Sequence, residues 1–461
     1  MTKFSARLLI VAALVTVGVA IQQQYRVHLK LQDPDGGHIN DFDRWMIMAP
    51  KFVHERADYV NDQLPTPPIS LLALAPFSSL SRPDAQFAWV CLKLPLAGLV
   101  FAMLLGIVRR SGAQLNASAM ALVVAGWWLP VVLDMQEGQT NFLALVPLVA
   151  GVYLAQEEYV GWDAVAGLLV GLAIAVKVTP AVFAVYFLWK RRWVVASSAV
   201  AGVVIWSLTV PAVAFGWDQN LRWLDQWARI MIVPYVTRGT VAYAMSQSFG
   251  SFALRFLSAV PVFESNHHGV NLGHYMNLFG LAPSAVFQVV RGIMIAVALG
   301  GLYWTRRPLD TLRCPRYLLE IGAVAAFMLW FSERTWVHHY VSFIFTLCAA
   351  GAVLSDTSQP EITRRATRAS LVVFALATVL ASEAGRILGP DGVDWAKGMG
   401  VFLWPSVLVT VAAICRWAPQ RRQVTAVARL PIFRYWPSRQ LQDCRMAGLQ
   451  EVKAEGRQSC V

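Results

Sequence analysis

The chain has 461 residues, of which 57% are hydrophobic and only 14% are charged, and its mean hydropathy is +0.50. This composition excludes a water-soluble domain of this length and predicts a polytopic membrane protein. The net charge of +12 does not indicate nucleic-acid binding, because the Lys and Arg residues form short clusters between apolar segments, as the positive-inside rule requires. We therefore interpret the charge as membrane topology and expect no nucleic-acid partner.

The first apolar segment, Leu8 to Ile21, follows Lys3 and Arg7 and is compatible with a cleaved signal peptide or a retained helix. We favour a retained helix. Further spans are expected at 85–108, 117–134, 141–156, 163–177, 180–190, 193–214, 284–304, 318–333, 339–354, 369–383 and 400–415. The sequence thus predicts an all-α bundle of about twelve transmembrane helices, in which 163–177 and 180–190 are the weakest spans and break at Pro180.

This topology places two long loops, about 22–84 and 215–283, outside the cytoplasm. The basic clusters then share the cytoplasmic side: Arg109 and Arg110, Lys190 to Arg192, Arg306 and Arg307, and Arg364, Arg365 and Arg368. We predict a multi-pass protein of the plasma (inner) membrane, with a membrane domain over 1–415. The tail 416–461 is basic, and we expect it to be a disordered cytoplasmic arm.

The cysteines and histidines indicate neither disulfides nor a metal site. All six cysteines lie in predicted spans or on the predicted cytoplasmic side, and no CxxC spacing occurs. His267, His268 and His274 have no carboxylates or cysteines at matching spacing. We therefore expect no metal and no cofactor.

Polar residues gather at the predicted outer ends of the spans. The segment from His38 to Ile69 holds carboxylates, cations and aromatic residues, and is typical of either a solvated loop or the chemical end of a membrane enzyme. The outer candidates are Asp41, Asp43, Gln139, Asn141, Lys177, Gln247, Arg255, Arg334, His338 and His339. Lys93, Arg291 and Glu320 lie deeper in predicted spans, where unpaired charge is costly, so we expect them to pair or to face a cavity.

Several motifs, in order, resemble glycosyltransferase family 87, the polyprenyl-phosphate-mannose-dependent mannosyltransferases of the GT-C superfamily. They are Asp-Phe-Asp-Arg-Trp at 41–45, Thr-Pro-Pro-Ile-Ser-Leu-Leu-Ala-Leu-Ala-Pro at 66–76, Gly-Gln-Thr-Asn at 138–141, Gly-Leu-Ala-Ile-Ala-Val-Lys-Val-Thr-Pro at 171–180, Gln-Ser-Phe-Gly at 247–250 and Trp-Val-His-His-Tyr at 336–340. Two departures bear on the acceptor more than on the fold. Thr66 replaces the usual Tyr before Pro67, and Ser332 precedes Glu333 where the family often has Pro.

The resemblance implies a GT-C-type bundle and inverting transfer of a hexose, with mannose expected, from a polyprenyl-phosphate sugar to a lipid or glycan acceptor on the extracytoplasmic face. By resemblance, the aspartate of the family's external loop corresponds to Asp41, with Asp43 as the alternative, and its late histidine to His338 or His339. Such a transfer needs a carboxylate base and cations near the departing phosphate. We expect donor phosphate and sugar to be bound by Gln139, Asn141, Lys177, Gln247, Arg255 and Arg334.

Two other classes of protein fit a charged membrane bundle. A secondary transporter predicts repeated half-sequences and charges near the membrane midplane. The sequence shows no such repeat, and its charge lies mostly at one face. A non-catalytic lipid-binding protein is disfavoured only by the clustering of polar groups.

Overall fold

A computed structural model describes residues 40–59, 65–238, 242–267, 270–389 and 391–414, together with Gly18, Gln22 and Tyr25. The described residues are mostly helical. Each predicted span from 85–108 onward coincides with a helix or with a run of joined helices. The expected first span, Leu8 to Ile21, lies outside the described residues apart from Gly18, as do the tail 416–461, His268, Cys415, Cys444 and Cys460.

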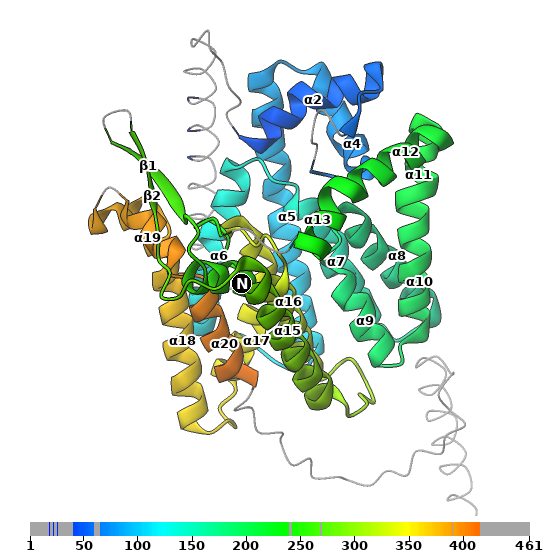
Figure 1. The fold of residues 1–461 in the computed structure, drawn as a ribbon. Helices are drawn as coiled ribbons and strands as arrows, with labels where there is room; N and C mark the ends of the chain where they lie inside the picture. The colour runs from blue at the N-terminus through cyan, green and yellow to red at the C-terminus, as the bar shows by residue number, and fades with distance from the viewer. Residues whose placement is uncertain are drawn as a thin grey trace, which may run out of the picture. The chain divides into compact units, whose positions relative to one another are not determined.

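Helices α2 to α20 follow one another along the chain (Figure 1). The first half comprises α2 (Asp41–Glu55), α4 (Pro68–Leu74), α5 (Arg82–Arg110), α6 (Ala117–Gln136), α7 (Asn141–Ala155), α8 (Val160–Val176), α9 (Ala181–Trp189), α10 (Trp193–Val204) and α11 (Val210–Phe215). The second half comprises α12 (Trp217–Trp227), α13 (Val233–Arg238), α14 (Phe249–Leu257), α15 (Pro283–Thr305), α16 (Pro315–Phe331), α17 (Ile344–Ser355), α18 (Glu361–Leu380), α19 (Gly392–Gly398) and α20 (Leu403–Ile414).

Short helical turns and one hairpin complete the described fold. The turns are η1 (Ala75–Ser79), η2 (Ile205–Thr209), η3 (Ala228–Ile232), η4 (Val337–Phe343) and η5 (Glu383–Leu388). Strands β1 (Phe263–His267) and β2 (Val270–His274) pair antiparallel, with Phe263 opposite His274. The all-α expectation is therefore correct except for this hairpin, which lies within the predicted loop 215–283. Both predicted loops also contain helices, α2 and α4 in the first and α12 to α14 in the second.

Local signals in the sequence explain where the long helices begin. Ser81 caps α5 by accepting a hydrogen bond from the Asp84 backbone N–H, and Asn116 caps α6 by accepting from Ala119. Such side chains satisfy backbone donors that the first helical turn leaves unpaired. Pro180 separates α8 from α9, as predicted, because its ring cannot continue a helical hydrogen-bond ladder.

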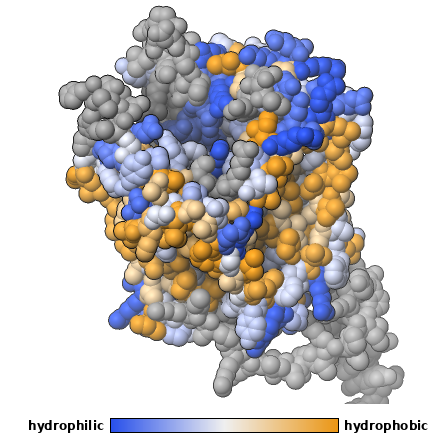
Figure 2. Space-filling model, viewed as in Figure 1, coloured by the Kyte–Doolittle hydropathy of each residue, from blue (hydrophilic) through white to orange (hydrophobic). Residues whose placement is uncertain are grey.

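In the part of the chain that the structure describes, five helical segments are long and apolar enough to cross a membrane: Arg82–Arg110, Ala117–Gln136, Trp193–Phe215, Pro283–Thr305 and Val337–Ser355. A sixth span is possible if α19 and α20, bent by 47°, are taken as one. A broad band of hydrophobic side chains crosses the middle of the face in Figure 2, with hydrophilic residues gathered above it. The chain is therefore a multi-pass membrane protein, whereas the number of twelve spans stays a prediction.

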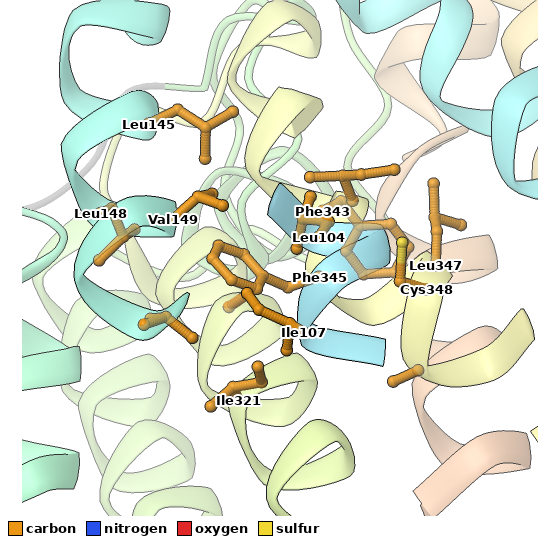
Figure 3. Packing of buried hydrophobic residues seen from close by; sticks show 14 of the residues in the cluster. Leu104, Ile107, Leu145, Leu148, Val149, Ile321, Phe343, Phe345, Leu347 and Cys348 are labelled. Atoms are coloured by element: carbon orange, nitrogen blue, oxygen red, sulfur yellow. The ribbon is translucent and has the colours of Figure 1, made fainter. Parts of the chain in front are cut away.

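The segment Val337–Ser355, formed by η4 and α17, lies at the centre of the bundle. Of its most apolar window, 89% is buried, against 6% for α15, whose side chains face outward. Figure 3 shows the packing around it, with Leu104 and Ile107 from α5 and Leu145 and Leu148 from α7 among the contributing side chains. Removing these side chains from water and filling the space between helices stabilises the arrangement.

The basic clusters meet at one end of the bundle. Their contacts join neighbouring helix ends: Arg110 with Tyr153 and Glu157, Lys190 with Thr305 and Arg307, Arg192 with Glu158, and Arg364 with Leu354. These residues lie at the ends of α5, α7, α9, α15 and α17. The grouping matches the distribution that the positive-inside rule predicts for one membrane face.

Close backbone contact between α8 and α10 depends on glycine. A Cβ atom added at Gly171 would lie 2.6 Å from Ala199 O and 2.7 Å from the Cα of Gly202. Only a residue without a side chain allows this approach, which is common between membrane helices.

We expect Gly171→Val to separate α8 from α10 and to lower the free energy of unfolding by about 1–3 kcal/mol, as overpacking does. The measurement is the melting temperature of the purified protein in detergent. Gly98→Val on α5 is the matched control, because nothing lies within 4 Å of a Cβ at that position. Equal melting temperatures for the two variants would contradict the assignment.

Candidate functional site

A cavity of about 910 Å³ lies at the end of the helices opposite the basic clusters. Its walls come from the start of α2, the turn between α6 and α7, the break between α8 and α9, the segment η3–α13, and the connection from α16 to η4. Its charged and polar lining includes Asp41, Arg44, Glu137, Gln139, Asn141, Lys177, Glu333, Arg334, His338 and His339. Seven predicted site residues therefore line one cavity.

Asp41 is the first residue of α2, and the turn before α7 holds it there. The Asp41 backbone N–H donates to Glu137 O at 3.2 Å. Its carboxylate accepts a hydrogen bond from Gln139 Nε2. The preceding Asn40 caps α2 and donates from Nδ2 to Gln136 O at 2.9 Å. Two segments nearly a hundred residues apart thus position this carboxylate at the cavity.

Gly138 allows this contact between the turn and α2. Its φ of +66° lies in the left-handed region, and a Cβ atom there would collide with Phe42. The Gly138 carbonyl accepts from Trp89 Nε1 at 3.1 Å, and Trp89 stacks on Phe42 with ring centroids 4.7 Å apart. The Gly-Gln-Thr-Asn motif therefore places Gln139 beside Asp41 through backbone geometry.

Asp43 does not line the cavity. It is 1% exposed and pairs with Arg82 through two contacts, Nε to Oδ1 at 2.9 Å and Nη2 to Oδ2 at 2.5 Å. Such a two-pronged pair fixes the carboxylate and occupies both of its oxygens. For this reason we do not propose Asp43 as the general base.

Lys177 follows the last residue of α8, and its ammonium donates to Asn141 Oδ1. Asn141 Nδ2 donates in turn to Asp134 Oδ2 at 2.7 Å and to His338 O at 3.3 Å. Asp134 pairs with Lys93 at 2.9 Å. The expectation that Lys93 pairs within the bundle is confirmed, and so is that for Glu320, which pairs with Lys190 at 2.8 Å.

His338 and His339 start η4 and line the cavity with their rings 4.7 Å apart and nearly perpendicular. His339 Nδ1 lies 3.1 Å from Trp336 N and 3.0 Å from Arg334 O, so the loop backbone engages this nitrogen in either tautomer. The His338 ring lies parallel to that of Trp336, with centroids 6.3 Å apart. Among the described residues no side-chain hydrogen bond of His338 occurs.

Arg334 is exposed at the cavity, and its Cζ lies 5.0 Å from the centre of the Tyr235 ring. Within the described ranges, no carboxylate forms an ion pair with its guanidinium. A guanidinium held over an aromatic ring keeps its hydrogen-bond donors for another group. Arg334 is therefore available to bind an anion in the cavity.

Gln247 and Arg255 lie outside the cavity, contrary to expectation. Gln247 Nε2 donates to Ala244 O and to Lys397 O, and its Oε1 accepts from Phe402 N. The fully buried Arg255 donates to Gly398 O, Tyr243 O and Ser246 O. Backbone carbonyls engage both side chains, although Arg255 Nη2 has no hydrogen-bond partner among the described residues. Since neither residue lines the cavity, we withdraw both as ligands of a donor.

Sequence reasoning assigned no role to Arg44 or Glu333, both of which line the cavity. Arg44 lies three residues after Asp41 on α2, and this spacing on a helix could have placed the two side chains on one face. Glu333 lies in the connection after α16, and burial raises the pKa of its carboxyl to about 7 against the opposing charges of Arg334 and Arg291. No local pattern indicated that Glu333 would be half-buried.

No cluster of three or more His, Cys, Asp or Glu side chains suited to a metal occurs within the described ranges. His274 stacks on Phe263, with ring centroids 4.5 Å apart, and lies on the hairpin with His267. His274 does not line the cavity.

Comparison with known proteins gives three mannosyltransferases as relatives. The polyprenol-phosphate-mannose-dependent alpha-(1-2)-phosphatidylinositol mannoside mannosyltransferase of Mycobacterium tuberculosis is 24% identical over 389 residues, which cover 79% of this chain and 80% of that protein. The protein of the same description from Mycolicibacterium smegmatis is 29% identical over 177 residues, covering 35% of this chain and 39% of that protein. A phosphatidylinositol pentamannoside mannosyltransferase of that organism is 32% identical over 141 residues, covering 29% and 31%.

No solved structure matches the chain significantly. The sequence profile of glycosyltransferase family 87 matches residues 66–332, which include Gln139, Asn141 and Lys177. Since this match covers more than half of the sequence, the chain belongs to glycosyltransferase family 87.

Proposed function

We propose that the protein transfers mannose from a polyprenyl-phosphate-mannose donor to a lipid or glycan acceptor, with inversion at the sugar and on the extracytoplasmic face of the plasma membrane. The observation that carries the proposal is a single cavity with the Asp41 carboxylate on one wall and Lys177, Arg334 and two histidines on the others. Membership of glycosyltransferase family 87 and the printed functions of the three relatives support the donor class.

In the proposed reaction, an acceptor hydroxyl attacks the anomeric carbon of mannose while the bond from that carbon to the phosphate oxygen breaks. Asp41 accepts the hydroxyl proton, and polyprenyl phosphate leaves from the opposite face of the sugar. The hydrogen bond from Gln139 Nε2 orients the Asp41 carboxylate while leaving it further lone pairs. Asp41 is therefore the proposed general base.

Cationic side chains are the proposed partners of the departing phosphate. Lys177, Arg334 and Arg44 line the cavity, and none of the three forms an ion pair with a carboxylate within the described ranges. Negative charge that develops on the leaving oxygen is stabilised when such groups are already in place. His338 and His339 lie beside them and can donate a hydrogen bond to the same phosphate.

The deeper part of the cavity is suited to the start of a prenyl chain. Leu145 and Leu148 on α7 and Met328 and Leu329 on α16 line it without a charged group. Leu145 and Leu148 belong to the hydrophobic cluster drawn in Figure 3. A polar entrance above an apolar floor matches a lipid whose phosphate lies at the membrane boundary.

The proposed face follows from the position of the basic clusters. Arg110 donates to Tyr153 O near the far end of α7, and Arg364 donates to Leu354 O near the far end of α17. The near end of α7 lines the cavity, and so does η4, which precedes α17. The positive-inside rule assigns the basic end to the cytoplasm. The cavity then opens on the extracytoplasmic side, in agreement with the proposed twelve-span topology.

The direct test is turnover by the purified protein. With polyprenyl-phosphate-mannose and a lipid extract, we expect release of polyprenyl phosphate and a product heavier by one hexose, read by mass spectrometry. The same activity should persist in a chelator, because cations from the chain face the phosphate. Folded protein that turns over no donor with any cell lipid or glycan extract would refute the proposal.

Asp41→Asn should lower turnover on the order of 10²-fold or more, because an amide cannot accept the proton. Donor binding and melting temperature should change little. Asp43→Asn is the control, because it disrupts the pair with Arg82 and should reduce thermal stability more than it reduces turnover. Full activity of the Asp41→Asn variant would contradict the assignment of Asp41 as the general base.

Glu333 should make donor binding depend on pH near neutrality. Its pKa is raised to about 7, so its carboxyl is neutral below that pH and becomes negative above it. The added charge repels the donor phosphate, and we expect the donor KM to rise roughly 5-fold between pH 6 and 8.

Glu333→Gln removes this titration and should flatten the pH profile of the donor KM. The variant stays neutral throughout, so any remaining dependence reports other groups such as the histidines. An unchanged profile in Glu333→Gln would exclude Glu333 as the source.

A further inference from the structure

Four polar side chains from four helices form a continuous chain that ends at the cavity, here called the 93–177 relay. It runs from Lys93 on α5 to Asp134 on α6, then to Asn141 at the start of α7 and Lys177 after α8. Asn141 and Lys177 line the cavity, whereas Lys93 and Asp134 lie behind its wall and are 1% and 0% exposed. The proposed reaction uses Lys177 and leaves the other two charges without a role.

The relay allows only one orientation of the Asn141 amide. The Asp134 carboxylate can only accept hydrogen bonds, and the Lys177 ammonium can only donate them. Asn141 Nδ2 therefore faces Asp134 Oδ2 at 2.7 Å, and Oδ1 faces Lys177. The second hydrogen on Nδ2 points to His338 O at 3.3 Å. Both N–H groups and the oxygen of the Asn141 amide therefore have a hydrogen-bond partner.

Lys93 stabilises the charged form of the buried Asp134 carboxylate. Its ammonium contacts Asp134 Oδ1 at 2.9 Å and donates to Asp134 O at 2.6 Å. A carboxylate buried without such a partner would be costly, and the apolar surroundings would favour its loss of charge. The pair is thus a means of keeping an acceptor behind Asn141.

We propose that Asp134, with Lys93 as its counter-ion, is a positioning residue that orients Asn141 and thereby holds the Lys177 ammonium where the donor phosphate binds. The inference rests on the proposed function for its catalytic meaning, but the placement of Lys177 can be measured without any substrate. The competing interpretation is that Lys93 and Asp134 only fasten α5 to α6.

Two double variants distinguish these interpretations. Both variants remove the two buried charges, but they differ in whether the side chain at position 134 can accept a hydrogen bond. In Lys93→Gln/Asp134→Asn, the new amides can hydrogen-bond to each other, and an acceptor for Asn141 Nδ2 remains. In Lys93→Met/Asp134→Leu, the volumes are similar but position 134 offers Asn141 Nδ2 no side-chain acceptor, which leaves it only His338 O. A positioning role predicts a donor KM on the order of 10-fold higher in the second variant than in the first, with a smaller change in kcat.

The Lys177→Met substitution tests whether Asp134 affects donor binding through Lys177. If Asp134 acts through Lys177, the two double variants should have the same donor KM once Lys177 is replaced, because coupled residues are not additive. A difference that persists in the Lys177→Met background would overturn the proposed route.

The matched control is the second buried pair, Lys190 with Glu320, whose side chains are 2% and 0% exposed at the opposite end of the bundle. Lys190→Met/Glu320→Leu should lower the melting temperature without raising the donor KM. A rise in donor KM equal to that of Lys93→Met/Asp134→Leu would show a general loss of stability and would refute positioning.

The readout that needs no donor is the rate at which Lys177 reacts with an amine-modifying reagent, measured by peptide mass spectrometry on the folded protein. In Lys93→Met/Asp134→Leu, Asn141 loses its hydrogen bond to position 134 and should hold the Lys177 ammonium less firmly. We therefore expect Lys177 to react several-fold faster in this variant than in Lys93→Gln/Asp134→Asn. If the wild type lacks transferase activity but the rates differ, only the proposed function fails. Equal rates would overturn the positioning role whether or not the enzyme is active.

Discussion

The cost of unpaired charge inside an apolar helix bundle is the constraint on which the packing of this protein depends. Lys93 and Asp134 satisfy one another between α5 and α6, and Asn141 extends the contact to α7 and α8. At the other end, Lys190 and Glu320 do the same between α9 and α16. Because an unpaired charge in this environment is costly, each pair restricts which helices can be neighbours. The cavity forms where the first of these networks reaches the surface of the apolar core.

The polar lining of the cavity comes from helix starts and short connections, and its apolar lining comes from the interiors of long helices. Asp41, Gln139, Lys177 and Arg334 all lie at helix starts or in breaks between helices. Leu145, Leu148 and Leu329 line the floor from within α7 and α16. A boundary between polar ends and apolar helix interiors suits a reaction that joins a lipid phosphosugar to a hydroxyl acceptor, since both halves of the donor find a matching surface.

Gln247 and Arg255 support the site indirectly. Their side chains bind carbonyl groups around α19 and the loop before α14, and the Gln247 backbone N–H donates to Thr335 O at 2.6 Å. Ser246 also pairs with Trp336 in a β-bridge. The Gln-Ser-Phe-Gly motif therefore borders the connection that carries Arg334 and the two histidines, although its own polar groups do not face the cavity.

The sequence alone determined the membrane class, the order and approximate positions of the apolar helices, the break at Pro180 and the family, because hydrophobic length and proline geometry are local properties. It also brought Asp41, Gln139, Lys177 and His338 together as candidates. Only the tertiary structure showed that Asp41 lines the cavity and Asp43 does not, since Asp43 pairs with Arg82, 39 residues away. It likewise placed Arg44 and Glu333 on the cavity wall and Gln247 and Arg255 away from it, because burial and hydrogen-bond partners arise from helix packing and leave no pattern along the chain.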